Sequence, residues 1–181
     1  AKNGALFGID EGQNGIGRTG QLFGYEYSGI RPDVMTVEKC LGAGLPLAAM
    51  MAVGTTWQLF EPGDHGSTIG GNPVTTAASI AAIKWIEKYK ILIKCKADFK
   101  YLSSNINSIP GVYEVRGAGL LIGIALQKNT SSEVAAALQA KGFLVNAANP
   151  NTIRVAPALN ISMKELNQFV KALKEVMSDV H

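Results

Sequence analysis

The sequence predicts an α/β protein, and three observations support this fold class. Short apolar segments in the first half of the chain are joined by glycine-rich turns, as is typical of buried strands. A long helical pattern then begins at Pro73. Beyond Pro110, strand-like and helix-like patterns alternate, which indicates a compact second unit of α+β type. With 181 residues, 47% of them hydrophobic, the chain can bury one large core or two small ones.

The first half is expected to hold three short strands. Residues 5–9 are apolar and predict a buried strand that ends at Asp10 and Glu11. Residues 33–39 alternate as a second strand, and residues 41–53 read as a tight turn followed by a third apolar segment. Short strands joined by loops favour a layered core.

The remaining elements are delimited by helix start and stop signals. Pro73 fits the first turn of the long helix, which is expected to break near Lys90. Gly142 is the expected stop of a later helix, and Ser162 with Glu165 forms a capping box at the start of the last one. The predicted helices cover residues 73–109, 131–142 and 162–177, and the predicted strands cover residues 112–117, 119–126, 143–148 and 152–157.

Charge and cysteine content exclude several classes of function. The 17 basic and 14 acidic side chains are scattered, without the basic run of a protein that binds nucleic acid or a membrane surface. No apolar run reaches the roughly 20 residues that span a bilayer. Cys40 and Cys95 have no metal-ligand spacing, so we expect no metal site, no disulfide framework and a reducing cytoplasmic location.

Two short motifs suggest nucleotide binding, but both are weak. Residues 15–20, "GIGRTG", match GxGxxG after a strand, yet a dinucleotide site needs a helix directly after them, and Gly24, Gly29 and Pro32 interrupt the next segment. The apolar strand ending in Asp10 is also similar to the metal-binding strand of a P-loop ATPase. However, the chain contains no GxxxxGK[ST] motif. Dinucleotide binding is therefore disfavoured.

Cys40 could act as a nucleophile with His65 as its base, since the adjacent Lys39 could activate the thiol. A small packed cysteine is the more common role for such a residue. His65 and His181 are the two histidines of the sequence, which excludes chemistry that rests on several histidines.

A strand-end acid, a lysine in a tight turn and a Gly/Ser/Thr loop form a more specific combination. Asp10 lies 29 residues before Lys39, and Thr68 lies 29 residues after it. The segments "DEGQNGIGRTG", "RPDVMTVEKCLGAGLP", "GDHGSTIGGNP" and "IRVAPAL" occur in order along the chain. Together they resemble the pyridoxal-phosphate-dependent aminotransferases of class III, most closely the acetylornithine aminotransferase branch.

The resemblance implies a role for each residue near the cofactor, pyridoxal 5'-phosphate. Lys39 matches the lysine that binds the cofactor aldehyde and then moves a proton. Asp10 matches the carboxylate that keeps the pyridine nitrogen protonated. Gln13 matches the residue that hydrogen-bonds the phenolic oxygen. Ser67 and Thr68 match the loop that reaches the cofactor phosphate of the neighbouring subunit, so a homodimer is implied.

In the second unit, Arg154 matches the arginine that binds the substrate α-carboxylate through its two-pronged donor geometry. The resemblance also implies the fold: the second half of an aspartate-aminotransferase-like (fold type I) cofactor domain over residues 1–95, and a C-terminal α+β domain over residues 96–181. The chain starts at Ala1, and the upstream half of the cofactor domain is expected to lie outside it.

Several residues beside the chemistry differ from the family pattern. Gly12 stands where a valine usually packs on the cofactor, so a void costing about 1–3 kcal/mol is expected there. Glu38 replaces a small residue, and strand alternation would place it on the face opposite Lys39. Cys40 replaces a glycine, and Asn14 a threonine.

The function implied by the resemblance is transfer of an amino group from N-acetylornithine to 2-oxoglutarate in arginine biosynthesis. The alternatives within the class are ornithine, succinylornithine and 4-aminobutyrate aminotransferases. Gly12, Glu38 and Cys40 motivate an alternative of another kind, a non-catalytic module derived from the fold. A nucleotide-binding domain is a third hypothesis, and it requires a helix after residues 15–20.

Overall fold

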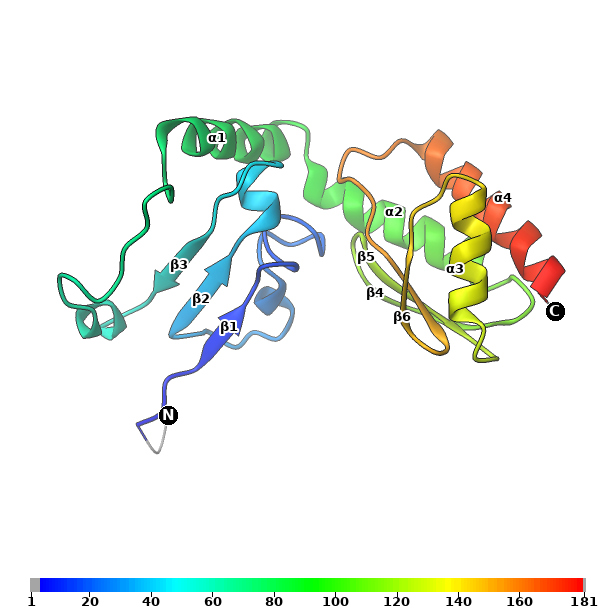
Figure 1. Ribbon diagram of the computed structural model, residues 1–181, viewed down its shortest axis with the longest axis horizontal. Helices are drawn as coiled ribbons and strands as arrows, with labels where there is room; N and C mark the ends of the chain where they lie inside the picture. Colours follow the sequence, from blue (N-terminus) through cyan, green and yellow to red (C-terminus); the bar gives the residue numbers. More distant parts are fainter. Residues whose placement is uncertain (1–3, 181) are drawn as a thin grey trace. The chain divides into compact units, whose positions relative to one another are not determined.

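A computed structural model describes residues 4–180, which form two compact units (Figure 1). The first unit ends at Lys90 and the second begins at Ile91. The junction coincides with the predicted break in the long helical pattern, because α1 (Pro73–Lys88) and α2 (Ile91–Ile106) are separate helices and Lys90 has a φ of +53°. The units therefore divide the chain a few residues before the expected domain boundary at residues 95 and 96, which lies inside α2.

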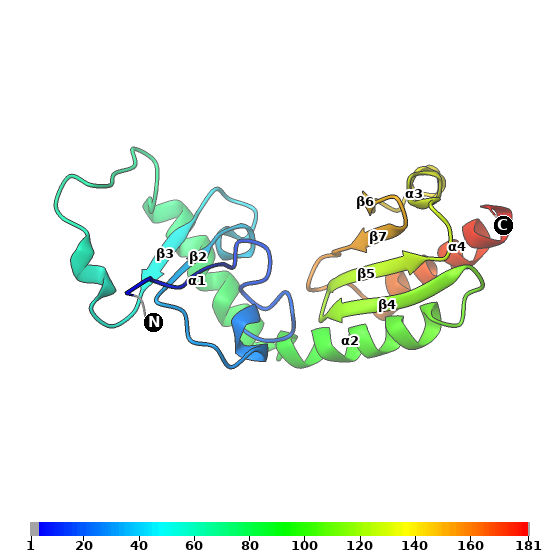
Figure 2. The ribbon, with the colours of Figure 1, turned by 90° about the horizontal axis from the view of Figure 1, so that it is seen from below.

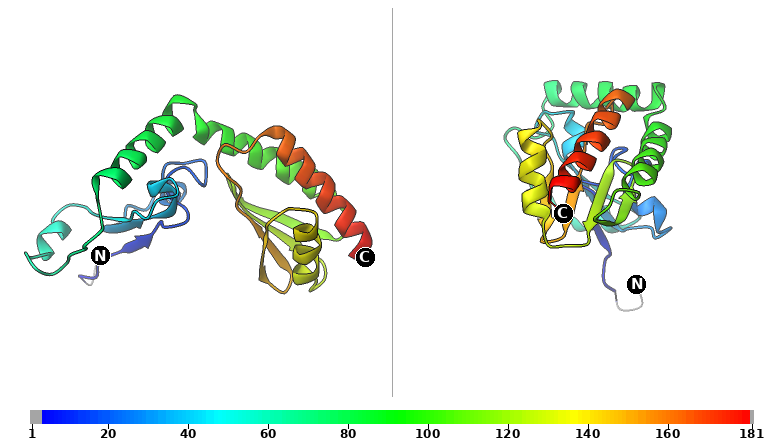
Figure 3. Two further views of the ribbon diagram at one scale, coloured as in Figure 1. Left: turned by 45° about the horizontal axis from the view of Figure 1, so that its top comes forward. Right: turned by 90° about the vertical axis from the view of Figure 1, so that its right-hand side faces the viewer.

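The first unit contains a three-stranded sheet in the order β1-β2-β3. β1 (Gly8–Asp10) pairs in parallel with β2 (Val34–Val37), and β2 pairs antiparallel with β3 (Ala49–Ala52). α1 lies beside this sheet (Figure 3). Three 3₁₀ helices occupy the connections: η1 (Gly24–Tyr27), η2 (Lys39–Gly42) and η3 (Thr56–Leu59).

The expectation that the first strand is buried is wrong for the described residues. Gly8 and Asp10 of β1 are exposed and Ile9 is half-buried, while Leu6 and Phe7 just before the strand are 54% and 45% exposed. A strand of a parallel sheet becomes buried when other layers cover both of its faces. Within residues 4–180, no such layers cover β1.

The start of α1 follows from its sequence. Pro73 occupies the first turn, where its missing N–H costs no helical hydrogen bond. Asn72 caps the helix, and its side-chain oxygen accepts the N–H groups of Val74 and Thr75 at 3.1 Å each. The predicted helix start is confirmed.

The second unit is an antiparallel sheet covered by helices (Figure 2). The strand order is β4-β5-β7-β6, and the helices α2, α3 and α4 contact one another or the strands. β6 differs most from its prediction, because it begins at Asn146 and not at Phe143, whose ring packs edge-on against Phe169 of α4. The elements are β4 (Val112–Ala118), β5 (Leu121–Leu126), α3 (Ser131–Ala140), β6 (Asn146–Asn149), β7 (Thr152–Val155) and α4 (Met163–Val180).

The two faces of this sheet differ in character. Ile122 and Ile124 of β5 pair with Val155 and Ile153 of β7, and all four side chains are buried. The intervening positions point to the other face, where Arg154 of β7 is exposed. The alternation places the core on the helix-covered face and Arg154 on the opposite face.

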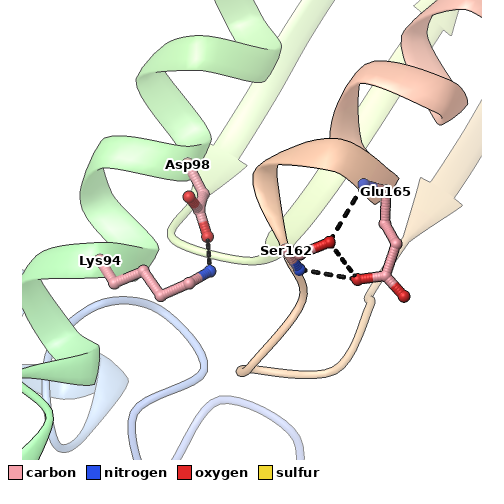
Figure 4. Close-up of polar contacts among 4 residues, drawn as sticks. All are labelled: Lys94, Asp98, Ser162 and Glu165. Atoms are coloured by element: carbon pink, nitrogen blue, oxygen red, sulfur yellow. Dashed lines mark hydrogen bonds and ion pairs between the residues drawn. The ribbon is translucent and has the colours of Figure 1, made fainter.

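Local stop and start signals of the second unit are confirmed. Gly142 has a φ of +88° just after α3, the left-handed conformation that ends many helices. At the start of α4, the Ser162 hydroxyl accepts the Glu165 N–H at 3.2 Å, and the Glu165 carboxylate accepts the Ser162 N–H at 2.8 Å (Figure 4). The Ser162 hydroxyl also donates to the Glu165 carboxylate at 2.7 Å, and this hydrogen bond, followed by that of the Ser162 N–H, lowers the pKa of Glu165, so the capping box stays intact at neutral pH.

An ion pair on α2 predicts a measurable effect on stability. The Asp98 carboxylate is buried and accepts a charge-assisted hydrogen bond from Lys94 one turn earlier (Figure 4). We expect Asp98→Ala to lower the free energy of unfolding by about 1–3 kcal/mol, because the half-buried Lys94 ammonium loses its partner. Urea denaturation followed by circular dichroism measures this change.

The control is Glu114→Gln. Glu114 pairs with Arg116 at 3.8 Å on β4, where both side chains are about half exposed, so its loss should leave the urea midpoint nearly unchanged. Equal shifts for the two variants would contradict the importance of burial at Asp98.

Candidate functional site

Asp10 is held at the carboxyl end of β1 by neighbours in the structure. Its Oδ1 accepts the Gly12 N–H at 2.8 Å and the Thr36 hydroxyl at 3.0 Å. Thr36 lies directly opposite Asp10 in the parallel register of β1 and β2. The Gly12 hydrogen bond, then the Thr36 hydrogen bond and the nearby positive charge of Lys39, lower the pKa of Asp10 despite a small opposing desolvation. Asp10 therefore remains a carboxylate.

Lys39 is the first residue of η2, two positions after the end of β2, and its backbone conformation is strained. Its φ is +45°, in the left-handed region that side chains other than glycine rarely adopt. Its ammonium forms an ion pair with the Glu38 carboxylate. The expectation that Glu38 and Lys39 lie on opposite faces is thus wrong, because β2 ends at Val37 and strand alternation does not extend to these residues.

The parallel pairing of β1 and β2 brings Asp10 and Lys39 to one edge of the sheet. The carboxyl ends of parallel strands lie at the same edge. Asp10 is the last residue of β1, and Lys39 follows the last residue of β2 by two positions. Their proximity is also visible in the effect of the Lys39 charge on the pKa of Asp10. The structure thus places two of the predicted site residues together.

Lys39 also lines a cleft of about 830 Å³. The glycine-rich loop after η3 also lines this cleft, with His65 and Ser67. Ser67 is exposed, and its hydroxyl accepts the Gly70 N–H at 2.9 Å, which fixes the loop locally. Thr68 is exposed beside Ser67 but does not line the cleft. The cleft volume is in the range of small-molecule sites, roughly 300–1,000 Å³.

The turn after β1 carries Gln13 and a residue that the sequence interpretation missed. Gln13 is half-buried in this turn. Its neighbour Glu11 is 1% exposed, and its carboxylate accepts the N–H groups of Gly24 and Tyr25 at 2.8 and 2.7 Å. Glu11 therefore anchors η1 to the end of β1 and supports the turn that holds Gln13. Its position beside Asp10 in "DEG" was the available signal, but its partners are 13 and 14 residues away.

Arg154 belongs to the second unit. It is the exposed residue of β7, and it pairs with Gly123 of β5 and Asn146 of β6. The side chains of Arg116 and Thr152 lie next to Gly123 on this face of the sheet.

Other motifs do not form sites in the described residues. The turns of residues 15–20 lead to the short 3₁₀ helix η1, so the helix that a dinucleotide site needs is absent from this part of the chain. Cys40 is half-buried, with Sγ 4.0 Å from Nη2 of Arg18, and Cys95 is buried in α2. Residues 4–180 contain no cluster of metal-ligating side chains. None of the helices described here has the length and apolar content to cross a membrane.

The void expected at Gly12 is not present. The Glu38 side chain occupies the space next to Gly12, since a Cβ built there would lie 2.7 Å from both Cγ and Oε1 of Glu38. An amine, two carboxylates and an adjoining cleft can bind a compound that carries a carbonyl and a basic ring nitrogen, because the amine attacks carbonyls and a carboxylate stabilises a protonated nitrogen.

The chain is similar over its whole length to known enzymes. An acetylornithine aminotransferase of Mycolicibacterium smegmatis is 45% identical over 179 residues, covering 98% of this chain and 46% of the relative. That of Streptomyces coelicolor is 42% identical over 180 residues, covering 98% of this chain and 45% of the relative. The chain therefore spans about half the length of the curated relatives it matches.

Solved structures show the same fold. An acetylornithine aminotransferase from Elizabethkingia anophelis superposes with a TM-score of 0.85 at 29% identity, covering 98% of this chain and 47% of that one. A transaminase from the marine bacterium Virgibacillus superposes with a TM-score of 0.91 at 26% identity, covering 99% and 46%. The family model described as "Aminotransferase class-III" matches residues 1–177. The chain belongs to the class III aminotransferases, a family of pyridoxal-phosphate-dependent enzymes.

Proposed function

We propose that this chain is the part of a pyridoxal-phosphate-dependent aminotransferase that carries the reactive lysine, Lys39, and that the enzyme transfers an amino group from N-acetylornithine to 2-oxoglutarate in arginine biosynthesis. The observation that carries the proposal is the parallel pairing of β1 and β2, which brings Asp10 and Lys39 to one edge of the sheet. The relatives named acetylornithine aminotransferase support the choice of substrate.

The residues at this edge fit pyridoxal phosphate. Both hydrogen bonds to Asp10 end on Oδ1, so Oδ2 can accept a further donor such as a protonated ring nitrogen. The lowered pKa of Asp10 keeps this carboxylate charged at neutral pH. Lys39 is exposed and lines the cleft, so its amine can reach an aldehyde. Gln13 would hydrogen-bond the phenolic oxygen, and Ser67 and Thr68 would bind the cofactor phosphate of the neighbouring subunit.

When bound, the cofactor supplies an electron sink for the electron pair left on the substrate Cα. The residues of this chain have separate tasks around it. Nζ of Lys39 would hold the cofactor, and the same amine, once free, would act as the base that takes the proton from the substrate Cα. The Asp10 carboxylate would stabilise the protonated ring nitrogen of the cofactor. Arg154 binds the substrate α-carboxylate through two parallel hydrogen bonds.

The proposal includes a homodimer. Ser67 and Thr68 lie on an exposed loop, so this loop can present its hydroxyl groups to the cofactor phosphate of a second subunit. The cytoplasmic location expected from the two cysteines stays a prediction.

The role of Arg154 gives a prediction on substrate affinity. We expect Arg154→Lys to raise KM for both the amino acid and the 2-oxo acid by about 10- to 100-fold, because lysine cannot form two parallel hydrogen bonds with a carboxylate, a loss of about 1.5–3 kcal/mol. Steady-state kinetics on the intact protein measure this change. Arg31→Lys, at an exposed arginine of the first unit, is the matched control and should leave KM unchanged. Equal KM values for Arg154→Lys and wild type would remove Arg154 from the site.

The test of the function has two parts. Pyridoxal phosphate is added to the intact protein, the visible absorption band of the bound cofactor is recorded, and borohydride reduction followed by peptide mapping locates the attachment. Label on Lys39 is expected, whereas a folded protein without band or label would refute the enzymatic role. Glutamate formation from 2-oxoglutarate is then compared for N-acetylornithine, N-succinylornithine, ornithine and 4-aminobutyrate. A higher kcat/KM for any donor other than N-acetylornithine would overturn the substrate assignment.

A further inference from the structure

Gly12 and Glu38 are 26 positions apart in the sequence, but they share one volume in the structure. A Cβ at Gly12 would lie 2.7 Å from Cγ and Oε1 of Glu38, and 2.9 Å from Oδ1 of Asp10. Carbon atoms in contact lie about 3.5–4.0 Å apart. Any side chain at position 12 would therefore force the Glu38 carboxylate away from its present place.

Backbone conformation does not explain the glycine at this position. Gly12 is not among the described residues with a positive φ, so another residue could adopt the same backbone without strain. The Glu38 side chain, together with Oδ1 of Asp10, fills the space next to position 12, and this is a local reason for a glycine there. A valine here, as in the family pattern, would require the Glu38 side chain to leave its present position.

The Glu38 carboxylate also reaches the reactive end of the neighbouring side chain. Its Oε1 accepts a hydrogen bond from Nζ of Lys39. Both side chains are accessible to solvent, at 61% for Lys39 and 47% for Glu38, so the ion pair is screened and can open. Glu38 thus lies between Gly12 and Lys39. It fills the space next to Gly12, and its carboxylate pairs with the ammonium of Lys39.

We propose that Gly12 and Glu38 form a coupled pair in which Gly12 provides the space for the Glu38 carboxylate and Glu38 acts as a positioning residue that holds the amine of Lys39 at the cleft. This proposal rests on the proposed role of Lys39 as the cofactor lysine. It explains two departures from the family pattern by one contact. It also assigns Glu38 a task that begins before cofactor binding, because an amine held by a carboxylate must leave it before it can attack an aldehyde.

The first test measures the reactivity of Lys39 without any cofactor. The intact protein is methylated with formaldehyde and a mild borohydride reductant, and the rate at each lysine is followed by mass spectrometry. We expect Glu38→Gln, which keeps the shape of the side chain, to increase the rate at Lys39 about two- to fivefold, the range of a weak exposed ion pair. Wild type in 1 M NaCl should approach the rate of this variant, since salt screens the pair.

The matched control is Glu175→Gln. Glu175 forms a comparable exposed ion pair with Lys141 at 2.9 Å in the second unit, so this variant should accelerate methylation at Lys141 and leave Lys39 unchanged. An unchanged rate at Lys39 in Glu38→Gln, with the control responding, would overturn the positioning role.

The second test measures the coupling between the two residues. We expect Gly12→Ala to lower Tm by about 2–4 °C in wild type and by clearly less in the Glu38→Ala background, where the new Cβ no longer meets the glutamate. Gly12→Ala should also accelerate methylation of Lys39, as Glu38→Gln does. Equal Tm losses in the two backgrounds would show independent residues and refute the pair. Neither test contains cofactor, so both are independent of the proposed function. If borohydride labelling located the cofactor at a residue other than Lys39, the proposed function would be refuted, but the measured coupling of Gly12 and Glu38 would still stand.

Discussion

Replacing Lys39 by arginine is expected to abolish covalent attachment of pyridoxal phosphate and to reduce transamination by on the order of 10³-fold or more, because a guanidinium neither attaches to the aldehyde nor moves the proton. The substitution retains the positive charge beside Glu38 and Asp10, so the fold of this edge should persist. The measurements are the visible absorption band, borohydride labelling with peptide mapping, and the rate of glutamate formation.

The chain offers a matched control for this variant. Lys90 is also a lysine in the left-handed region, with a φ of +53°, but it lies at the junction of α1 and α2 and does not line the cleft. Lys90→Arg should therefore keep the band, the label and the rate of wild type. Retention of more than a few per cent of activity in Lys39→Arg, with label elsewhere, would exclude Lys39 as the reactive residue.

The second large effect is expected at Asp10. Asp10→Asn should lower kcat by on the order of 10²–10³-fold, because a neutral amide no longer stabilises a protonated ring nitrogen. The amide oxygen can still accept the Gly12 N–H and the Thr36 hydroxyl, so the local geometry is preserved and the loss reports the charge. Steady-state kinetics and circular dichroism separate loss of activity from loss of fold.

Asp33→Asn is the matched control for Asp10→Asn. Asp33 directly precedes β2 and accepts the Phe7 N–H at 2.8 Å, so it belongs to the same sheet but lies near the edge opposite Asp10. This variant should keep the kcat of wild type. Similar losses in both variants would indicate a structural role for Asp10 and contradict the electrostatic one.

The pKa of Asp10 also determines the pH range over which the kcat of Asp10→Asn should lie below that of wild type. Because the pKa is lowered in the folded state, the stabilising contribution of the carboxylate is present above the unfolded value of about 3.9 and is lost as the pH falls through the folded pKa. The wild-type kcat should therefore show no titration of Asp10 between pH 5 and pH 9. The deficit of Asp10→Asn should be constant over the same range.

Local signals in the sequence predicted a large part of the fold. The start of α1 at Pro73, the break at Lys90, the stop at Gly142 and the capping box of Ser162 and Glu165 depend on neighbours within a few residues, and all are confirmed. The sequence grouped Asp10 with Lys39 through the family resemblance, whereas the parallel pairing of β1 and β2 was not predicted.

Features that depend on distant partners were not predictable in this way. The burial of Glu11 requires N–H groups 13 and 14 residues away, and the contact of Glu38 with the space at Gly12 spans 26 positions. Exposure of β1 was mispredicted for a related reason, since an apolar strand pattern does not reveal which layers are present to cover it. The start of β6 was mispredicted because the ring of Phe143 packs against α4.

The left-handed backbone at Lys39 has a consequence for the evolution of this chain. An L-residue with a side chain costs roughly 1–2 kcal/mol in this conformation, whereas glycine adopts it freely. A sequence selected for thermal stability alone would therefore favour glycine at position 39. Under the proposed function, the reaction requires an amine at this position, so selection for turnover maintains a residue that selection for folding would remove. Lys39 is thus a local trade-off between stability and activity, confined to one residue at the end of β2.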